Sequence, residues 1–533
     1  MTDENTDSNN TGDTSDTTVD DTDSMTGSDT FSYGTDSDVI DTDTYPDITD
    51  DPLYDTGSIF TDPGQFAEKI PALADFWITP RDDVNGGFFT YVDITGEPTA
   101  NTNKSVVTQS RSAYGFVRAF MLTGDETYLE NARHALDFNI AHAWDTKNDG
   151  WFYELKEDGT ITANGQNNQK WSFIQHYALL GLNAYTEATQ NTHYKDWLMK
   201  GWDSNEEHLW DSDPVNYGYF NYADADWSNP DGKGFTPSAD GITTNVLGMS
   251  IVMNSPAGTK RLSQLVSNMY DHFITASMFD FIEFGLAEEY NNDWSLNTNS
   301  TFGFIGHVLK TAWCLGRGHL VTGDDESDKW LDRASELIMD VWDNGGYDHV
   351  NGAPYYSFLW DNIDSIDDSQ VEYWQVEQAI TSGLINYYAS KKQKERAIFL
   401  QMAEESMQFF LDYFFDDVNG GIYSRTLPDG TILSDTKGDY YKSAYHGIET
   451  LYYGYLYGSL YYANLPVTLC YSFKDLDEDL NVKLTPIAIE DNVLKITSVE
   501  KDGEPYADFK SNLRELNVKK GNGGIFKVTF ERK

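Results

Sequence analysis

The sequence predicts a mainly α-helical protein, an (α/α)6 barrel of six helical hairpins with a disordered acidic N-terminal tail and a small C-terminal all-β appendage. Three observations predict this fold class. Apolar residues recur at helical spacing in twelve long segments, a short turn motif recurs between them, and apolar patterns of strand length follow the last one. The expected boundaries are 1–60 for the tail, 61–465 for the barrel and 466–533 for the appendage.

The first 60 residues consist largely of Asp, Thr, Ser and Gly. They include 17 acidic residues, and the first basic residue of the chain is Lys69. Such a segment buries too little apolar surface to offset the entropy cost of ordering, so we expect it to be disordered.

The whole chain carries a formal net charge of −51, of which about −34 lies beyond the tail. This charge argues against nucleic acid as a partner, because phosphates are repelled, and against adhesion to an anionic membrane surface. Salt screens the self-repulsion of such an acidic protein, so we expect a halophilic, high-salt setting. The two cysteines, Cys314 and Cys470, lie in apolar stretches and are interpreted as core thiols rather than a disulfide or a metal site.

The twelve helical segments form six consecutive pairs. Asp125 precedes one of them, and Asp325 or Ser327 precedes another, where a side-chain oxygen accepts the free N–H groups of a first turn. The expected helices cover residues 65–77, 104–122, 126–142, 169–189, 193–206, 240–254, 258–277, 299–321, 326–342, 369–389, 392–414 and 438–461.

The recurring turn motif reads Asp82-Asp-Val-Asn-Gly-Gly-Phe-Phe89 near the start of the barrel and Asp416-Asp-Val-Asn-Gly-Gly-Ile-Tyr423 near its end. Asn-Gly and Gly-Gly supply the positive φ angles of a tight turn, and the apolar residues after them are typical of a short strand. Because the first and last repeats are nearly identical, neither resembles a capping repeat. A closed ring is therefore favoured over an open solenoid, with alternate helices lining its inside.

Beyond the barrel, apolar patterns typical of strands occur at 467–473, 481–485, 493–498 and 524–530. A structural, a carbohydrate-binding and an oligomerising role for this appendage all stay open.

Polar and aromatic residues concentrate on the even-numbered helices, which would form the inner ring, whereas an outer helix carries a charged segment at 392–396. This segregation predicts a central polar and aromatic pocket. The candidate residues are Arg111, Tyr114, His176, Asn245, His307, Trp374, Glu377, Tyr445 and His446.

His307 and His446 occur in Gly- and aromatic-rich segments at the starts of two inner helices. Imidazole both takes up and returns a proton near neutral pH, so the two residues suggest a proton-transfer pair. For either histidine alone, the alternative is a hydrogen-bonded core residue.

The segments Glu372-Tyr-Trp-Gln-Val-Glu377 and Lys442-Ser-Ala-Tyr-His446 resemble the N-acylglucosamine 2-epimerase superfamily, which includes cellobiose 2-epimerases and mannose or related aldose–ketose isomerases. Gln-Ser-Arg111 and Gly-His307 add to the resemblance, which covers roughly residues 62–463. It implies a barrel that epimerises or isomerises a free reducing sugar without a metal or other cofactor. The implied partner is a mono- or disaccharide, and we expect a monomer or homodimer without a membrane span. The resemblance favours the cytoplasm, although the Asp/Thr/Ser tail also suits an extracellular or surface-anchored protein.

The resemblance also implies a mechanism and assigns roles. After ring opening, one histidine removes the C2 proton to give a cis-enediol(ate), and another returns it to the opposite face of C2 or to C1; His307 and His446 are the candidates. Arg111 suits a developing enediolate or a sugar hydroxyl, or alternatively an ion pair with Glu377. Trp374 suits stacking on a pyranose, and Glu377 suits orienting a histidine or assisting ring opening. We expect Tyr114, His176, Asn245 and Tyr445 to complete the substrate-binding set.

Three positions differ from the family pattern. Lys310 stands where the family's Gly-His-x-x-Glu motif ends in Glu, residues 243–245 contain no histidine, and Tyr441 replaces a Trp. A third histidine and a carboxylate assisting His307 are therefore expected to be missing. Two other functions stay open: an (α/α)6 glycoside hydrolase or polysaccharide lyase, with a carboxylate pair drawn from Glu372, Glu377 and Asp439, and a non-catalytic sugar-binding protein.

Overall fold

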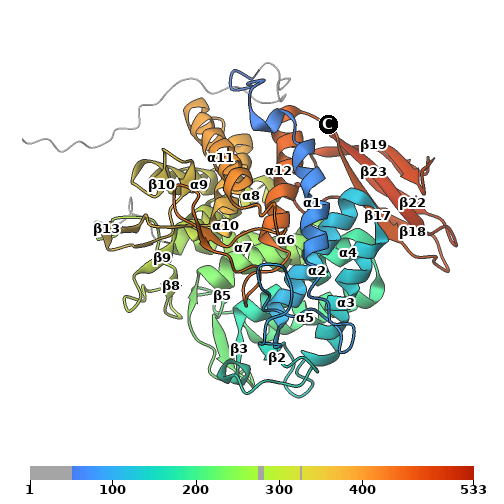
Figure 1. Cartoon of the computed structure of the whole chain (residues 1–533), viewed down its shortest axis with the longest axis horizontal. Helices are drawn as coiled ribbons and strands as arrows, with labels where there is room; N and C mark the ends of the chain where they lie inside the picture. Colours follow the sequence, from blue (N-terminus) through green and yellow to red (C-terminus); the bar gives the residue numbers. More distant parts are fainter. Residues whose placement is uncertain (1–50, 274–280, 324–326) are drawn as a thin grey trace, which may run out of the picture. The chain divides into compact units, whose positions relative to one another are not determined.

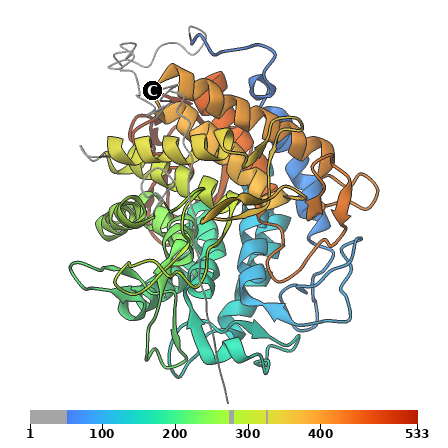
Figure 2. The same ribbon diagram turned by 90° about the vertical axis from the view of Figure 1, so that its left-hand side faces the viewer.

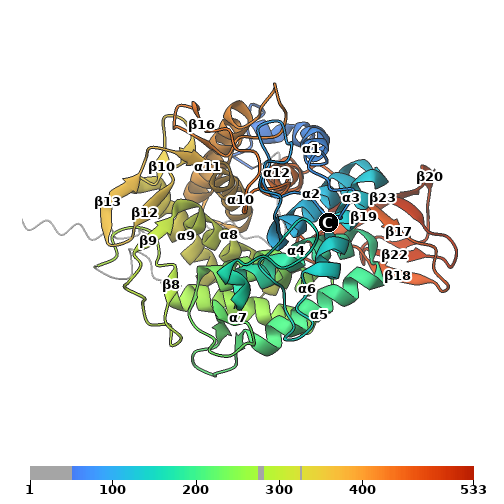
Figure 3. The same ribbon diagram turned by 60° about the horizontal axis from the view of Figure 1, so that its bottom comes forward.

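Alternate helices of the chain contact one another in a closed ring. The computed structural model describes residues 51–273, 281–323 and 327–533, all within a unit that spans Asp41–Lys533. The predicted tail up to residue 50 and the predicted cap Asp325 lie outside the described residues. In the described part, α2 contacts α4, the sixth helical segment follows, and α8, α10 and α12 return the ring to α2. Figure 3 shows these inner helices around the centre.

Each inner helix is paired with an outer one, and the observed bounds agree closely with the expected segments. α3, α5, α7, α9 and α11 each pack on the inner helix before them, and α1 packs on α12. The helices are α1 Gly64–Phe76, α2 Val106–Thr123, α3 Glu126–His142, α4 Ser172–Thr189, α5 Thr192–His208, α6 Leu247–Ile251, α7 Pro256–His272, α8 Ile305–Thr322, α9 Asp328–Asp343, α10 Tyr373–Ala389, α11 Gln393–Tyr413 and α12 His446–Tyr457.

The sixth inner segment differs from the single regular helix expected at 240–254. It begins earlier, with two stretches of wider π-type turns, η4 Thr236–Asp240 and η5 Ile242–Val246, before α6. The Thr244 hydroxyl donates to the Asp240 carbonyl at 2.6 Å within this stretch. Such π turns bulge the backbone and change where its side chains point, and they are frequent at functional sites.

Three inner helices begin later than expected, and short strands directly precede two of them, α8 and α10. The expected starts at 299, 369 and 438 become Ile305, Tyr373 and His446. The short strands of the barrel are β1 Lys104–Ser105, β2 Glu154–Leu155, β3 Gln169–Trp171, β4 Trp210–Asp211, β5 Gly218–Tyr219, β6 Tyr222–Asp224, β7 Lys233–Gly234, β8 Glu289–Tyr290, β9 Phe302–Phe304, β10 Tyr347–Asp348, β11 Ala353–Pro354, β12 Ser357–Leu359, β13 Asn362–Asp367, β14 Val371–Glu372, β15 Arg425–Thr426 and β16 Ile432–Ser434. Figures 1 and 2 show those of the 150–235 region on one side of the helices.

The recurring turn is locked by a buried ion pair. Asp82 accepts the backbone N–H groups of Val84 and Asn85, and its other oxygen accepts the Lys104 ammonium at 2.7 Å. The adjacent Gly86 has φ +86°, as the motif predicts. Similar locks join Asp145 to Lys170 and Asp416 to Lys437.

Packing of the chain begins before the expected boundary at residue 60. Phe60 is buried, Tyr54 stacks on Tyr462, and Asp51 forms an ion pair with Arg396 of α11. Residues 51–60 therefore belong with the barrel rather than with a tail.

The C-terminal residues form two antiparallel sheets, of order β17-β23-β19-β20 and β18-β22-β21. Three short strands add to the four expected, and β17 packs on α2 and α4. Figure 1 shows the strands beside these helices. Their bounds are β17 Val467–Phe473, β18 Leu480–Lys483, β19 Leu494–Lys501, β20 Glu504–Pro505, β21 Phe509–Lys510, β22 Glu515–Val518 and β23 Gly524–Arg532.

One loop of this region, residues 484–490, is buried along its whole length and packs against the C-terminal ends of inner helices. Glu490 accepts Arg317 of α8 at 3.0 Å, and the Ile487 N–H donates to Glu187 of α4 at 3.0 Å. Glu187 also accepts Arg118 of α2 at 2.7 Å. We call residues 484–490 the plug loop, because it joins three inner helices at one end of the ring.

Candidate active site

The opposite ends of the inner helices surround a cavity of about 580 Å³. All six inner segments contribute residues from their first two turns, so their N-terminal ends point toward it. Helix N-termini carry partial positive charge, which favours a ligand that is anionic or becomes so. The lining residues used below are Arg111, Tyr177, Asp240, His307, Lys310, Glu372, Trp374, Asp439, Tyr441, Lys442 and His446.

His307, in the first turn of α8, is held on two sides. Its Nδ1 lies 2.9 Å from Glu288 Oε2, and its ring stacks on Phe235 with centroids 3.8 Å apart. The other oxygen of Glu288 accepts the backbone N–H of Phe304 at 2.8 Å. This arrangement fixes the imidazole plane and leaves Nε2 as the nitrogen available to a ligand.

Glu288 corrects an expectation from the sequence. The carboxylate assisting His307 is not missing: Glu288 supplies it from a loop 19 residues earlier, where no local pattern marks it. The pairing of β7 with β8 places Glu289 opposite Gly234, next to the start of the sixth inner segment.

His446, the first residue of α12, is buried more deeply than His307. Its Nδ1 lies 2.5 Å from Glu377 Oε2, and Glu377 is completely enclosed on α10. Burial, together with the positive charges of Arg111 and Lys310, holds the pKa of His446 well below its ordinary range. The imidazole is therefore neutral near pH 7, with its Nε2 left for a ligand.

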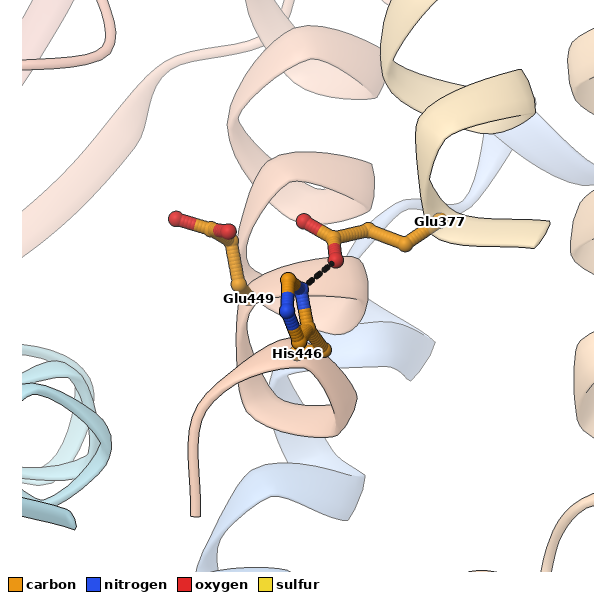
Figure 4. Close-up of side chains that lie close together, drawn as sticks. All are labelled: Glu377, His446 and Glu449. Atoms are coloured by element: carbon orange, nitrogen blue, oxygen red, sulfur yellow. Dashed lines mark hydrogen bonds and ion pairs between the residues drawn. The ribbon is translucent and has the colours of Figure 1, made fainter. Parts of the chain in front are cut away.

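A second buried carboxyl group lies beside this pair. Glu449 is one turn after His446, and its Oε1 accepts the Tyr114 hydroxyl at 2.6 Å. Burial and the neighbouring Glu449 raise the pKa of Glu377 well above its ordinary value. The raised pKa favours the protonated form of Glu377, as expected for a buried carboxyl beside a second carboxyl. Figure 4 shows both beside the imidazole.

Glu377, His446 and Glu449 are also the described residues that come close enough together to hold a cation. One ligand atom of each lies within 4.8 Å of the others. The hydrogen bond between His446 Nδ1 and Glu377 and the one from the Tyr114 hydroxyl to Glu449 already engage all three groups. The same geometry is accounted for by hydrogen bonds alone.

Trp374 lies between the two histidines. Its ring centroid is 5.2 Å from that of His307 and 6.3 Å from that of His446. The two imidazoles therefore line one cavity, on either side of an indole that offers an apolar surface to a sugar ring.

Arg111 lines the cavity but does not form the ion pair with Glu377 considered above. Its Nη1 donates to the Tyr441 carbonyl, and its guanidinium lies over the Tyr177 ring at 4.1 Å. Its Nε has no protein partner among the described residues. Such a guanidinium, held by one carbonyl and a ring face, retains N–H groups for a ligand oxygen.

His176 and Asn245 do not line the cavity, so the expected contact of either with substrate is not supported by position. They lie behind its wall, where Asn245 Nδ2 is 2.9 Å from His176 Nδ1. Complete burial lowers the pKa of His176 to about 4, so it is a neutral core residue at pH 7. Tyr114 and Tyr445 also lie behind the wall, where Tyr445 packs on His446 at 4.2 Å.

The alternative carboxylates of a hydrolase are already engaged. Glu372 accepts Arg425 Nε at 3.2 Å, and Asp439 accepts the backbone N–H groups of Tyr441 and Lys442. Both line the cavity, and these contacts use one oxygen of each carboxylate. No helix in the described ranges is both long enough and apolar enough to cross a bilayer.

Comparison with known proteins places this architecture in a family. Residues 87–449 match the N-acylglucosamine 2-epimerase family. The cellobiose 2-epimerase of Ruminococcus albus is 23% identical over 383 residues, 68% of this chain and 90% of that protein. The D-mannose isomerase of Marinomonas mediterranea is 20% identical over 395 residues, 71% of this chain and 93% of that protein. The structure of cellobiose 2-epimerase from Bacillus thermoamylovorans matches with a TM-score of 0.64 at 18% identity, covering 74% of this chain and 99% of that chain, so the fold is shared. Because the family match extends over more than half of its length, the chain belongs to the N-acylglucosamine 2-epimerase family.

Proposed function

We propose that the protein catalyses epimerisation or aldose–ketose isomerisation of a free reducing sugar by proton transfer at C2. The observation that carries the proposal is the pair of imidazoles in one cavity, each with its Nδ1 held by a glutamate. A fixed Nδ1 leaves Nε2 to exchange a proton with bound sugar. The relatives named cellobiose 2-epimerase and D-mannose isomerase support this class of reaction.

The proposed reaction begins when ring opening exposes the C1 carbonyl and makes the C2 proton acidic. His446, neutral near pH 7, accepts that proton through Nε2. The C–H electron pair forms the C1=C2 bond, and the carbonyl pair moves onto O1, which gives a cis-enediolate. His307, when both of its ring nitrogens carry protons, donates the Nε2 proton to the opposite face of C2 and gives the epimer. Transfer of the O2 proton to O1 followed by protonation of C1 gives the ketose instead, and exchange with solvent then restores the starting protonation of both imidazoles.

Exchange of carbon-bound hydrogen tests this proposal directly. The protein is incubated in D2O with mannose, glucose, cellobiose and N-acetylmannosamine, at low and at molar salt, and followed by NMR. Deuterium at C2 or C1 is expected for at least one sugar, and His307→Asn or His446→Asn should each lower the exchange rate by about 10²-fold or more. Release of reducing ends from an oligosaccharide without exchange would support a hydrolase instead. Binding with neither reaction would support a sugar-binding protein.

A further inference from the structure

Lys310 places an incompletely hydrogen-bonded ammonium inside the cavity. It lies one turn after His307 on α8, and its Nζ is 2.5 Å from Asp240 Oδ1. The same oxygen accepts the Tyr177 hydroxyl at 3.2 Å. An ammonium has three N–H groups, and Asp240 is the one acceptor that Lys310 reaches among the described residues. Two N–H groups therefore remain for a partner from outside the protein.

A second buried lysine of the same cavity shows the contrast. Lys442 donates to the Ile422 carbonyl at 2.6 Å, the Ser424 hydroxyl at 3.0 Å and the Thr436 carbonyl at 3.2 Å. Its three N–H groups are all used to hold the segment before α12. Since buried donors without partners are costly, the unused donors of Lys310 point to a ligand oxygen rather than to a structural role.

The position of Lys310 relative to both histidines gives this ammonium a chemical role. It follows His307 at helical spacing of three residues, so the two side chains lie on one face of α8. Its charge also acts on His446 across the cavity. Although burial opposes it, the Asp240 carboxylate raises the pKa of Lys310, so the side chain stays charged.

We propose that Lys310 binds and stabilises the sugar oxygen on which negative charge develops when the C2 proton is removed, with Asp240 and Tyr177 as positioning residues that hold its ammonium. The inference rests on the proposed function and extends it by naming the group that stabilises the negative charge. The carbonyl electron pair that moves onto O1 is met by the two unused N–H groups of Lys310, and Lys310 keeps its proton throughout. Lys310 thus places a cation where the family motif has a carboxylate, and Asp240 orients that cation toward the substrate.

The first test separates binding of substrate from stabilisation of charge. For a sugar that the wild type exchanges, Lys310→Met should lower kcat for C2 exchange by about 10²–10³-fold, as removal of an oxyanion donor does. KM should change by less than about threefold, because the interaction strengthens only as charge develops. Tyr177→Phe, which removes one of two hydrogen bonds to the Asp240 oxygen, should lower kcat by only about threefold to tenfold.

The second test uses ligands that do not react. Calorimetry compares an aldonohydroxamate of the exchanged sugar, which is planar and resembles the enediolate in charge once it loses its acidic proton, with the corresponding neutral alditol. Lys310→Met should weaken the hydroxamate by about 10²-fold and the alditol by less than about threefold. The matched control is Lys104→Met, which removes an equally buried ammonium from the turn lock with Asp82, away from the cavity. It should leave both affinities unchanged.

The outcomes distinguish the two proposals. Absence of exchange by the wild type with every sugar tested would defeat the proposed function. If the wild type exchanges a sugar, either of two results would overturn the role of Lys310. One is a kcat of Lys310→Met within threefold of the wild-type kcat, and the other is an equal loss of affinity for the hydroxamate and the alditol. If Lys310→Met does not fold by thermal unfolding, the double variant Lys310→Met/Asp240→Asn, which removes both charges of the pair, takes its place with the same expectations.

Discussion

The raised pKa of Glu377 predicts that two conservative substitutions act on the pH profile in different ways. Burial and the neighbouring Glu449 both raise that pKa, and Glu449→Gln removes the second cause, so the pKa of Glu377 falls and its anion, which faces His446, becomes more populated. That anion favours imidazolium and raises the pKa of His446. A base must be neutral to accept a proton, so the acid limb of kcat/KM for C2 exchange moves to higher pH.

Glu377→Gln should behave differently because the amide resembles the protonated carboxyl that it replaces. Its oxygen accepts from His446 Nδ1, and its amide N–H donates to Glu449. The pKa of His446 stays low, since burial, Arg111 and Lys310 are unchanged. The amide alters the strength of one hydrogen bond by about 1 kcal/mol, which corresponds to roughly a fivefold to tenfold lower rate without a shift of the limb.

The size of the Glu449→Gln shift follows from the 2.5 Å contact between His446 Nδ1 and Glu377 Oε2. Opposite charges centred about 4 Å apart attract by about 4 kcal/mol at an effective dielectric constant of 20. One pH unit corresponds to about 1.4 kcal/mol, so even a third of that attraction moves the limb up by about one unit.

The assay is kcat/KM for C2 exchange between pH 4.5 and 8 for the wild type and both variants. Glu490→Gln is the matched control, because Glu490 is a buried glutamate paired with Arg317 at the plug loop. An unshifted limb in Glu449→Gln, or an upward shift in Glu377→Gln, would refute the protonated state of Glu377.

Three further predictions concern stability. Burial raises the pKa of Asp82, but the Lys104 ammonium helps to lower it, and the net value is about 2. The carboxylate therefore stabilises the fold above its ordinary pKa, and this stability is lost as pH falls toward 2. Urea unfolding at pH 7 should show that Asp82→Asn lowers the free energy of unfolding by about 2–5 kcal/mol. The control Asp348→Asn should lower it by about 1–2 kcal/mol, because that turn has the same backbone hydrogen bonds but no lysine within reach in the described part of the chain. Arg317→Met leaves Glu490 buried without its cation and should cost about 3–5 kcal/mol in the same assay, with an unchanged pH limb. Molar KCl should raise the thermal midpoint relative to 0.1 M, because it screens the excess of acidic charge; a lower midpoint would contradict the high-salt interpretation.

The helices were predictable because each carries its own local signal. Apolar spacing and the Asn-Gly-Gly turn depend only on neighbouring residues, and nine of the twelve expected segments begin within a few residues of the observed helices. The later starts of α8 and α10 have a common cause. The strands Phe302–Phe304 and Val371–Glu372 contain apolar or aromatic residues that continue the pattern of the following helix, so spacing alone does not separate them.

The site was predictable only where a side chain belongs to a local motif. His307, His446, Arg111 and Trp374 line one cavity, as their places at the starts of inner helices predict. Glu288 was missed because it reaches His307 through strand pairing across a loop, not through spacing on a helix. Asn245 was misplaced because the π-type turns of the sixth segment change the direction of its side chains, and helical spacing assumes regular turns. His176 follows with it, because its Nδ1 lies 2.9 Å from Asn245 Nδ2 behind the cavity wall.

The two ends of the ring follow from one property of the inner helices, their common direction. Their C-terminal ends carry partial negative charge, and there Arg118 and Arg317 lie near the ends of α2 and α8 and bind the carboxylates beside the plug loop. Their N-terminal ends carry partial positive charge and meet at the cavity, where Lys310 adds a full one. An enediolate formed between His307 and His446 therefore lies in a field set by the backbone before any side chain acts. The helix direction that stabilises cations at the plug loop thus also favours an anion at the other end, and it opposes imidazolium there, in the same sense as the lowered pKa of His446.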